Sequence, residues 1–297
     1  MRWTQTLIPT LRQVPAEAVV PSHQLMVRAG LIQQVSAGSY TYLPLGWRAL
    51  AKVMGIVREE MDRAGAVEVF LPTLQPVEWW EQTGRRTDYG QNLFVVTDRH
   101  GREQALGPTH EEVVTKLVAT CVHSYRQLPL TLYQIQTKFR DEFRPRFGVL
   151  RSREFQMKDA YSFDLTAEGL DVSYQKMYDA YCRIFDRCGL GYVVVEAESG
   201  PIGGSASHEF MVTSPTGEDV ILSSDKDDYA ANVEKCEIGP RPHDFSGAIT
   251  GDLEKVHTPD LPGIDDVGKF MKVKPAHLLK SMLYVATRDS DTEGKEP

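Results

Sequence analysis

The chain has 297 residues, of which 41% are hydrophobic and 25% charged, as is typical of a soluble globular protein. This length suffices for one large domain, or for one domain and part of another, without disulfide or metal staples. The formal net charge of −8 argues against a general nucleic-acid coat, although a local cluster of cations can still bind anions.

The cysteines and the N-terminal segment indicate a reducing, cytoplasmic setting. Cys121, Cys182, Cys188 and Cys236 have no CxxC spacing, which argues against a zinc site or a redox pair, so we expect no resident metal. Two of them fall on the apolar faces of predicted helices, where buried free thiols are expected. The N-terminus lacks the apolar stretch of a signal peptide, and no run approaches the ~18 apolar residues of a membrane helix.

The first long predicted element is an amphipathic helix over residues 46–64. Apolar residues recur at spacings of three and four and form one stripe, which consists of Trp47, Leu50, Met54, Val57 and Met61. Gly65 follows as the expected C-terminal cap. A short strand over residues 67–72 comes next and is closed by Pro72.

Residues 94–98 and 103–107 are predicted to form a hairpin, and residues 110–122 a second helix. The segment before this helix fits a capping box, with Thr109 at the N-cap and Glu112 at N3. Such a cap leaves Glu111 without a capping role and fixes the loop that presents it.

Positive charge is concentrated between residues 138 and 159, where seven of 22 residues are Lys or Arg. A strand is predicted over residues 131–142, and its alternation separates an apolar face from a face of long polar groups. The polar face, predicted to form the floor of a cleft, carries Gln134, Gln136, Lys138, Arg140 and Glu142.

A loop then reverses the chain, and the returning strand is predicted to place Arg151, Arg153, Phe155, Met157 and Asp159 on one side. Guanidinium groups suit phosphate oxygens, and an aromatic ring beside them can stack on a nucleobase. Glu142 and Asp159 are suited to orient an amine or the hydration shell of Mg²⁺. The charge pattern alone leaves an alternative open, a solvated hairpin with weak surface ion pairs.

A third helix is predicted over residues 170–188 and ends at Gly189, followed by strands at 192–198 and 208–212. Hairpins rather than a strict strand–helix alternation indicate an α+β fold, with a largely antiparallel sheet and helices packed on it. Ser207 and His208 follow a Gly/Ser-rich stretch, and either line a pocket or simply begin a strand.

The composition changes near residue 224. Pro-rich and acidic turns there are typical of a linker, and residues 270–286 are predicted to form a helix and the start of a strand. The chain then ends in a polar segment. We therefore expect a first domain over residues 1–223 and, over 224–297, a linker and the truncated start of a second domain.

The charged segment has the form R-x-E … R-x-x-x-F-x-x-x-D, which resembles the second signature motif of class II aminoacyl-tRNA synthetases. Residues 38–72 resemble the first motif of the bacterial type of prolyl-tRNA synthetase, a dimer-forming helix and strand. GPTHEE at 107–112 resembles the proline-recognition loop of this family, and residues 136–163 and 202–210 are similar to the family's sequence. The resemblance covers nearly the whole chain.

The resemblance implies a fold, an antiparallel sheet flanked by helices, and a reaction. Proline and ATP, the latter with Mg²⁺, would form prolyl-adenylate and pyrophosphate, and the prolyl group would pass to the 3′ end of tRNA(Pro). The reaction mainly requires that carboxylate and α-phosphate are held in line while charge is neutralised. The resemblance also implies a homodimer formed through residues 38–76.

The resemblance also implies the roles of individual residues. Arg140 would hold the α-phosphate and the proline carboxylate, and Glu142 would meet the adenine amino group or the substrate amine. Arg151 would reach the distal phosphates of a bent ATP. Phe155 would stack under adenine, and Asp159 completes the expected ATP-binding set.

For the amino acid, the resemblance implies that Thr109 and Glu111 take the proline ammonium, with Ser207 and His208 in the pocket wall. Lys280 lies where the family's inserted domain, which hydrolyses mischarged alanyl-tRNA, carries a lysine. An ordinary solvent-facing lysine is the alternative at this position.

Two parts of the family pattern are not found in the chain, the third motif with its phosphate-binding arginine and the anticodon-binding domain. We therefore expect the N-terminal part of a proline–tRNA ligase, weak or inactive in adenylation by itself. One alternative is a non-catalytic relic that binds tRNA or a partner protein. Another is an adenylating enzyme that charges a different acceptor.

Overall fold

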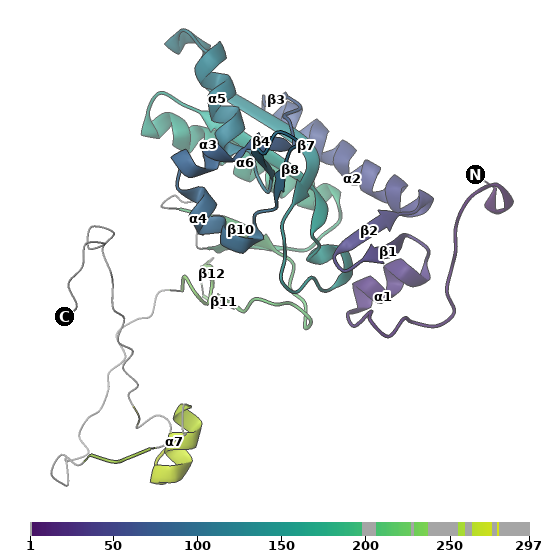
Figure 1. The fold of residues 1–297 in the computed structure, drawn as a ribbon, viewed down its shortest axis with the longest axis vertical. Helices are drawn as coiled ribbons and strands as arrows, with labels where there is room; N and C mark the ends of the chain where they lie inside the picture. The colour runs from purple at the N-terminus through teal and green to yellow at the C-terminus, as the bar shows by residue number, and fades with distance from the viewer. Residues whose placement is uncertain are drawn as a thin grey trace. The chain divides into compact units, whose positions relative to one another are not determined.

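A computed structural model of the chain describes residues 2–197, 206–226, 229–236, 255–258, 263–274 and 278. The chain divides into two compact units, residues 1–237 and 238–297. The helices described in the first unit are α1 Pro21–Arg28, α2 Pro44–Arg63, α3 Val77–Gln82, α4 Arg85–Tyr89, α5 Glu111–Cys121 and α6 Ala167–Arg187 (Figure 1). Short 3₁₀ turns lie at Trp3–Gln5, Gly90–Asn92, Tyr125–Gln127 and Gly148–Leu150.

The long hairpin of β7 (Leu130–Phe139) and β8 (Glu154–Phe163) forms the centre of the first unit. The two strands are antiparallel, in a register that runs from Leu130↔Phe163 to Phe139↔Glu154, and β3 (Val67–Glu68) pairs with β7 in parallel. The remaining strands are β1 Ile32–Ser36, β2 Ser39–Tyr42, β4 Leu74–Pro76, β5 Val95–Thr97, β6 Glu103–Leu106, β9 Val193–Glu196, β10 His208–Met211, β11 Ile221–Ser223 and β12 Ala230–Asn232.

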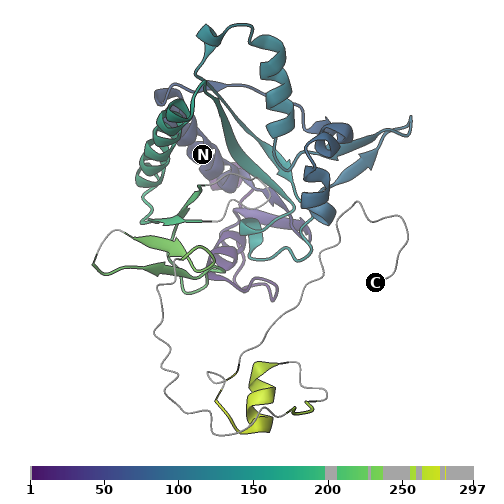
Figure 2. The same ribbon diagram turned by 90° about the vertical axis from the view of Figure 1, so that its left-hand side faces the viewer.

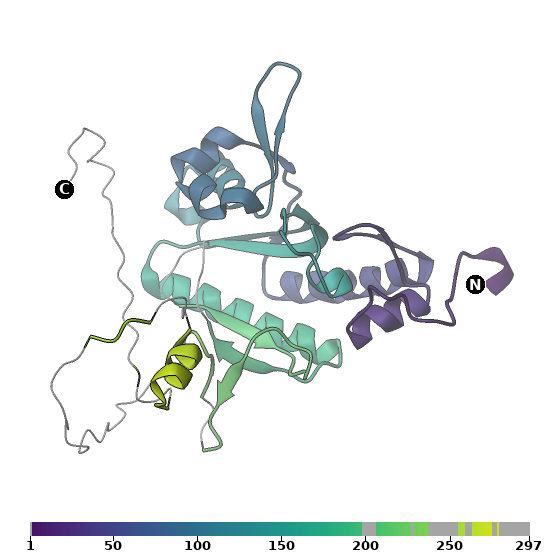
Figure 3. The same ribbon diagram turned by 60° about the horizontal axis from the view of Figure 1, so that its bottom comes forward.

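These strands form three further sheets, with the orders β1-β2, β4-β6-β5 and β10-β9-β12-β11. Most pairings are antiparallel, and the two parallel pairings, β3–β7 and β12–β9, are short. The predicted α+β class, with largely antiparallel sheets flanked by helices, is confirmed. The hairpin predicted near residues 94–107 corresponds to β5 and β6, which project from the unit in Figure 3.

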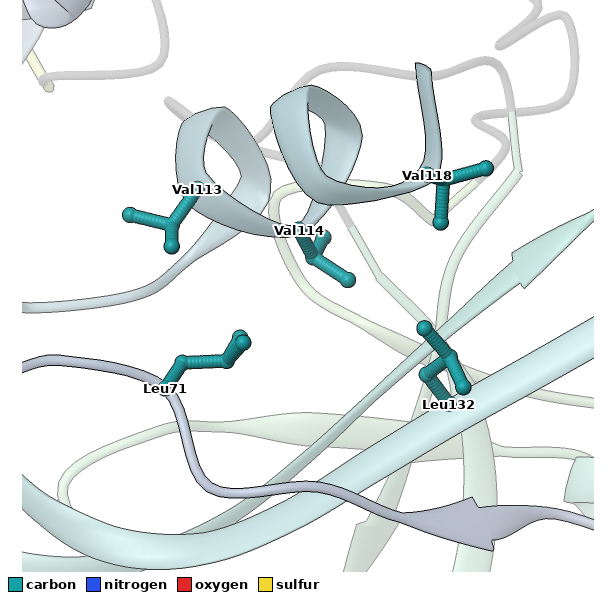
Figure 4. Packing of buried hydrophobic residues seen from close by; sticks show 5 residues of the cluster. All are labelled: Leu71, Val113, Val114, Val118 and Leu132. Carbon is teal, nitrogen blue, oxygen red and sulfur yellow. The ribbon is translucent and has the colours of Figure 1, made fainter. Parts of the chain in front are cut away.

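Helix α5 covers one end of the β7–β8 hairpin (Figure 2). Its valines meet apolar residues from β7 and from the segment after β3, and each side chain in this cluster is at most 9% exposed (Figure 4). The cluster consists of Leu71, Val113, Val114, Val118 and Leu132. Burial of such side chains contributes about 1.5–3 kcal/mol each, so α5 and the loop before it are firmly attached to the hairpin.

Helices α2 and α6 pack against each other beneath the hairpin. The carboxylate of Glu60 is fully buried there and lies 2.7 Å from Arg183 and 2.6 Å from Arg187. Burial opposes its ionisation, but these hydrogen bonds prevail and lower the pKa of Glu60. Gly65 and Gly189 follow the two helices with φ of +83° and +71°, a conformation that favours glycine, as their predicted capping roles require.

Several details differ from the sequence-based expectations. The strand expected over residues 67–72 is limited to β3, because the following residues diverge from β7. Trp47 on the predicted core stripe of α2 is 51% exposed. Buried thiols were expected on the apolar faces of helices, but Cys121 at the end of α5 is exposed, and Cys182, Cys188 and Cys236 are half-buried. No helix in the described ranges is long and apolar enough to cross a membrane.

The second unit contains α7 (Ile264–Met271), and Lys272 is the C-cap residue of this helix. Most of the segment 275–286, including Lys280, lies outside the described residues. The division between the units falls after residue 237, and β12 pairs within the first unit. The assignment of residues 224–297 to a linker and the truncated start of an inserted domain stays a prediction.

Candidate active site

The loop before α5 presents Thr109 and Glu111 together. The hydroxyl of Thr109 donates a hydrogen bond to Glu111 Oε2 at 2.6 Å. The loop has little freedom, because the side-chain amide of Gln75 donates to the Thr109 carbonyl at 2.9 Å. A Cβ at Gly107 would lie 2.2 Å from the same amide, so any other residue there would displace Gln75. The two residues expected to receive an ammonium group are therefore held side by side.

The predicted capping box is wrong. His110, not Thr109, is the N-cap residue of α5, and no side chain caps this helix start. Thr109 uses its hydroxyl for Glu111 instead. Glu112 accepts hydrogen bonds from Arg85 at 2.8 Å and from Thr83 at 2.9 Å, so its carboxylate is turned away from the N-cap.

A cavity of about 450 Å³ opens in front of Thr109 and Glu111. Its wall brings together five residues that the sequence assigns to the amino-acid site, namely Thr109, Glu111, Arg140, Ser207 and His208. Aromatic side chains of α6 and β10, among them Tyr178, Tyr181 and Phe210, supply an apolar side. The cavity thus joins a carboxylate, a guanidinium and aromatic rings, a combination that suits a small zwitterion with an apolar body.

Arg140 follows β7 directly and contributes the cation of this cavity. Its guanidinium lies over the ring of Phe155, with 5.4 Å between Cζ and the ring centroid. Its Nε is buried without a hydrogen-bond partner, and no ion pair of Arg140 occurs among the described residues. An uncompensated guanidinium at a cavity wall is suited to bind an anion, because the cost of its burial is then recovered.

Ser207 and His208 occupy the opposite wall, at the start of β10. The Nδ1 of His208 lies 2.7 Å from the hydroxyl of Tyr174 on α6. The imidazole also meets the ring of Tyr178 edge-on at 5.8 Å. These contacts fix the side chain at the cavity, and its role toward the amino acid stays a prediction.

A second cavity, of about 430 Å³, lies along the loop between β7 and β8. Its lining contains Glu142 and the guanidinium groups of Arg144, Arg146 and Arg151. Arg151 donates to Glu142 at 3.0 Å and to Glu218 at 3.1 Å. These guanidinium groups are placed to meet phosphate oxygens.

The structure corrects the predicted position of Arg151. The strand β8 begins at Glu154, and Arg151 forms an isolated bridge with Arg146 in the loop. Phe155 is on the strand and lies beneath Arg140. Its stacking on adenine stays a prediction.

The polar face within β7 is buried, so the predicted cleft floor is wrong for Gln134, Gln136 and Lys138. Arg140 and Glu142 follow the strand, and each lines one of the two cavities. Gln134 and Lys138 are fully buried, and Gln136 is 4% exposed. The segment after β3 covers them, because Gln134 accepts from the Leu71 amide at 3.1 Å and Gln136 donates to the Leu71 carbonyl. Where the segment after β3 no longer pairs with β7, the side-chain amides of Gln134 and Gln136 thus make the hydrogen bonds that backbone groups would make in a sheet.

Asp159 lies directly opposite Gln134 in the β7–β8 register. Its carboxylate accepts hydrogen bonds from Gln134 at 2.9 Å, from Lys138 at 3.1 Å and from Tyr161 at 2.5 Å. Burial and the nearby carboxylates of Glu111 and Asp159 raise the pKa of Tyr161. The expected role of Asp159 toward ATP stays a prediction, and in this structure the carboxylate balances a buried cation.

Sequence reasoning assigned no role to His110 or Arg85, and it placed Lys138 only on the polar face of the predicted strand. His110 and Lys138 are fully buried, and burial together with Lys138 lowers the pKa of His110 to about 4. Burial likewise lowers the pKa of Lys138. A lysine in an alternating polar strand indicates exposure, so nothing in the sequence pointed to the contact between Lys138 and His110.

Arg85 supports Glu111 from the side opposite the cavity. Its Nη1 lies 3.0 Å from Glu111 and 2.8 Å from Glu112. The guanidinium also lies over the rings of Trp80 and Tyr89, at 5.0 and 5.4 Å from their centroids. Arg85 is 8% exposed, so it acts inside the protein.

The part of the chain that the structure describes holds no group of three or more His, Cys, Asp or Glu side chains placed to bind a metal ion. The carboxylates suggested for a Mg²⁺ hydration shell, Glu142 and Asp159, both accept hydrogen bonds from cationic side chains. A divalent ion in this site would therefore depend on other ligands, such as the phosphates of a nucleotide.

The fold agrees with comparisons to known proteins. The family described as the tRNA synthetase class II core domain (G, H, P, S and T) matches residues 94–283. The chain belongs to this family.

Among curated relatives, the proline–tRNA ligase of Oleidesulfovibrio alaskensis is 55% identical over 286 residues, which cover 96% of this chain and 50% of that protein. The proline–tRNA ligase of Geobacillus sp. (strain WCH70) is 56% identical over 284 residues, with the same coverage. The chain thus spans about half the length of the curated relatives it matches.

A solved structure, Giardia lamblia prolyl-tRNA synthetase in complex with prolyl-adenylate, has the same fold with a TM-score of 0.55. It is 22% identical to this chain, and the match covers 58% of this chain and 36% of that one.

Proposed function

We propose that this chain carries the proline- and ATP-binding part of a proline–tRNA ligase. The observation that carries the proposal is the guanidinium of Arg140, which has no ion pair among the described residues and shares a cavity with Thr109 and Glu111. An amino acid placed between them would direct its ammonium to Glu111 and its carboxylate to Arg140. The identity to curated proline–tRNA ligases supports proline as this amino acid.

In the proposed reaction the proline carboxylate attacks the α-phosphate of ATP, a P–O bond forms, and pyrophosphate leaves. The carboxylate is already a nucleophile at neutral pH, so no general base is needed. Arg140 neutralises charge that develops between the two reactants and holds them in line. Transfer of the prolyl group to the 3′-terminal adenosine of tRNA(Pro) would complete the function.

The arginine-lined second cavity supports binding of the ATP phosphates. Arg144, Arg146 and Arg151 provide guanidinium forks there, and Glu142 is hydrogen-bonded to Arg151. We propose that Mg²⁺ accompanies ATP and is held mainly by its phosphates. Such an ion would spread the negative charge of the leaving pyrophosphate.

We also propose a homodimer formed through residues 38–76 and a cytoplasmic location. Apolar side chains in this region are exposed, and they include Trp47 (51%), Val53 (43%), Val67 (54%), Phe70 (81%) and Leu74 (52%). Large exposed apolar side chains in one region of the chain support an interface there. No disulfide joins any of the four cysteines, which suits a reducing compartment.

The proposed function can be tested by calorimetry with 5′-O-(N-prolylsulfamoyl)adenosine, a non-reactive analogue of prolyl-adenylate. We expect the chain to bind it at least tenfold more tightly than the alanyl analogue, because the aromatic side of the cavity suits the proline ring. Arg140→Ala should weaken binding by about 10²-fold, as expected for loss of a charge-assisted contact in a desolvated site.

The matched control is Arg126→Ala, since Arg126 is an exposed arginine in the 3₁₀ turn before β7. This variant should bind as the wild type does. Equal binding of the prolyl and alanyl analogues, or no binding of either by a folded chain, would refute proline recognition. Proline-dependent exchange of labelled pyrophosphate into ATP then tests whether the chain also performs adenylation.

A further inference from the structure

His110, the residue between Thr109 and Glu111, is fully buried and joins two distant segments. Its Nε2 lies 3.0 Å from the carbonyl oxygen of Pro72, and its Nδ1 lies 2.5 Å from Nζ of Lys138. An ammonium group only donates hydrogen bonds, so Nδ1 must accept. The proton of the neutral imidazole therefore resides on Nε2 and is donated to Pro72.

The backbone of His110 is held by the same cluster of groups. Its N–H donates to the hydroxyl of Tyr161 at 2.9 Å, and this hydroxyl donates to Asp159 at 2.5 Å. Lys138 Nζ lies 3.0 Å from the same carboxylate. Imidazole and backbone of His110 thus both depend on the buried Lys138–Asp159 pair.

A buried ion pair is costly, and an apolar pair of similar volume often gives equal or better stability. Packing alone therefore does not explain a fully buried lysine two residues before Arg140. Its three donors do account for it, because they are directed to Asp159, to His110 and, at 3.5 Å, to Gln136. The ammonium links the strand that ends at Arg140 to the loop that carries Thr109 and Glu111.

We propose that Lys138 is a positioning residue for amino-acid recognition. Its ammonium fixes the Nε2–H tautomer of His110 and thereby holds Thr109 and Glu111 at the distance from Arg140 that an amino acid requires. The substrate class is a small amino acid whose ammonium is received by Glu111. This inference rests on the proposed function, and it adds a residue that touches no substrate.

The decisive variant is Lys138→Met, which keeps an unbranched side chain as far as the Cε position and removes the ammonium donors. We expect the affinity for 5′-O-(N-prolylsulfamoyl)adenosine to fall at least tenfold, while the affinity for ATP alone changes less than twofold. Nitrogen NMR of the His110 ring, assigned by its absence in His110→Gln, should show the Nε2–H tautomer in the wild type. In Lys138→Met it should show a mixture of both tautomers.

Two further variants separate positioning from stability. Lys138→Met alone leaves the carboxylate of Asp159 buried without its cation, which lowers stability. The double variant Lys138→Met with Asp159→Asn removes both charges, so it should regain this stability while the prolyl analogue still binds weakly. Glu60→Gln weakens another buried ion cluster, between α2 and α6, and should lower stability without a change in analogue affinity.

The inference is overturned if Lys138→Met keeps both the wild-type tautomer and an analogue affinity within twofold of the wild type. It is also overturned if ATP and analogue weaken equally in a folded variant, since that indicates a general loss of structure. A wild-type chain that binds ATP but not the prolyl analogue refutes the proposed function. In that event, an unchanged His110 tautomer in Lys138→Met still refutes the role of Lys138.

Discussion

Arg85 and Glu111 meet behind the proposed amino-acid cavity, with 3.0 Å between Nη1 and Oε2. The same oxygen accepts the hydroxyl of Thr109, and no hydrogen bond to Oε1 of Glu111 occurs in the described part of the chain. One carboxylate oxygen is thus anchored from two sides, and the other is left to face a ligand. Arg85 also pairs with Glu112, whose side chain is 2% exposed.

Arg85→Gln should therefore affect both stability and binding. Glu112 would lose its cation while it remains buried, which costs about 3–5 kcal/mol of unfolding free energy. We expect the affinity for the prolyl analogue to fall about tenfold, because Glu111 loses one of its two anchors. Urea unfolding and calorimetry measure the two effects.

Arg86 provides the matched control, since it pairs with the exposed residues Glu81 and Glu103. Arg86→Gln should change neither quantity measurably, because exposed ion pairs contribute little. Unaltered analogue affinity in Arg85→Gln would show that Glu111 does not need its arginine.

His110 makes the stability of the chain depend on pH. Burial and Lys138 lower the pKa of His110 to about 4, below that of the unfolded chain, near 6.5. Between these values the unfolded chain binds a proton that the folded chain does not, so stability falls as pH falls through this window. The expected loss from this residue is about 2 kcal/mol between pH 7 and pH 5.

The measurement is urea unfolding at both pH values for the wild type and for His110→Gln. The variant is expected to be less stable at pH 7, but its stability should decline by about 2 kcal/mol less toward pH 5. Parallel declines in the two proteins would mean that His110 titrates normally.

The sequence allowed the main elements to be predicted where one periodic pattern sufficed. The stripe that ends at Met61 indicates α2, and the alternation through Tyr133 indicates β7. Alternation separates two faces of a strand, but it cannot show what covers each face. Lys138 is covered by His110, which lies 28 residues earlier in the chain. His110 in turn contacts the carbonyl oxygen of Pro72.

The same limit applied to the site. Arg140, Thr109 and Glu111 were found because their motif resembles a known family, and the structure brings them to one cavity. The supporting residue Arg85 belongs to no such motif. Arg85 reaches Glu111 because the fold brings α4 next to the start of α5. A single sequence contains no signal for this contact.

Glu218 pairs with two arginines of the second cavity, at 2.7 Å from Arg146 and 3.1 Å from Arg151. A phosphate that binds these guanidinium groups must compete with this carboxylate. Glu218→Gln should therefore raise the affinity for ATP about two- to fivefold at low salt, with a smaller gain at high salt because the charges are screened. Calorimetric titration with ATP at two salt concentrations measures this.

Glu103→Gln serves as control, because it removes a carboxylate from another exposed arginine. It should leave ATP binding unchanged at both salt concentrations. If Glu218→Gln instead weakens ATP binding, the carboxylate supports the site and does not compete with phosphate.

Phe70 follows β3 and is 81% exposed, which makes it the most exposed of the apolar side chains in the proposed dimer region. In a two-fold symmetric dimer each substitution occurs twice, so Phe70→Glu removes two apolar contacts and adds two like charges. We expect the dimer to weaken at least 100-fold, as followed by sedimentation velocity over a concentration series. Leu165→Glu, at an exposed leucine outside residues 38–76, should leave the dimer intact. A wild-type chain that stays monomeric at about 50 μM would refute the homodimer. A Phe70→Glu variant that dimerises as the wild type does would place the interface elsewhere.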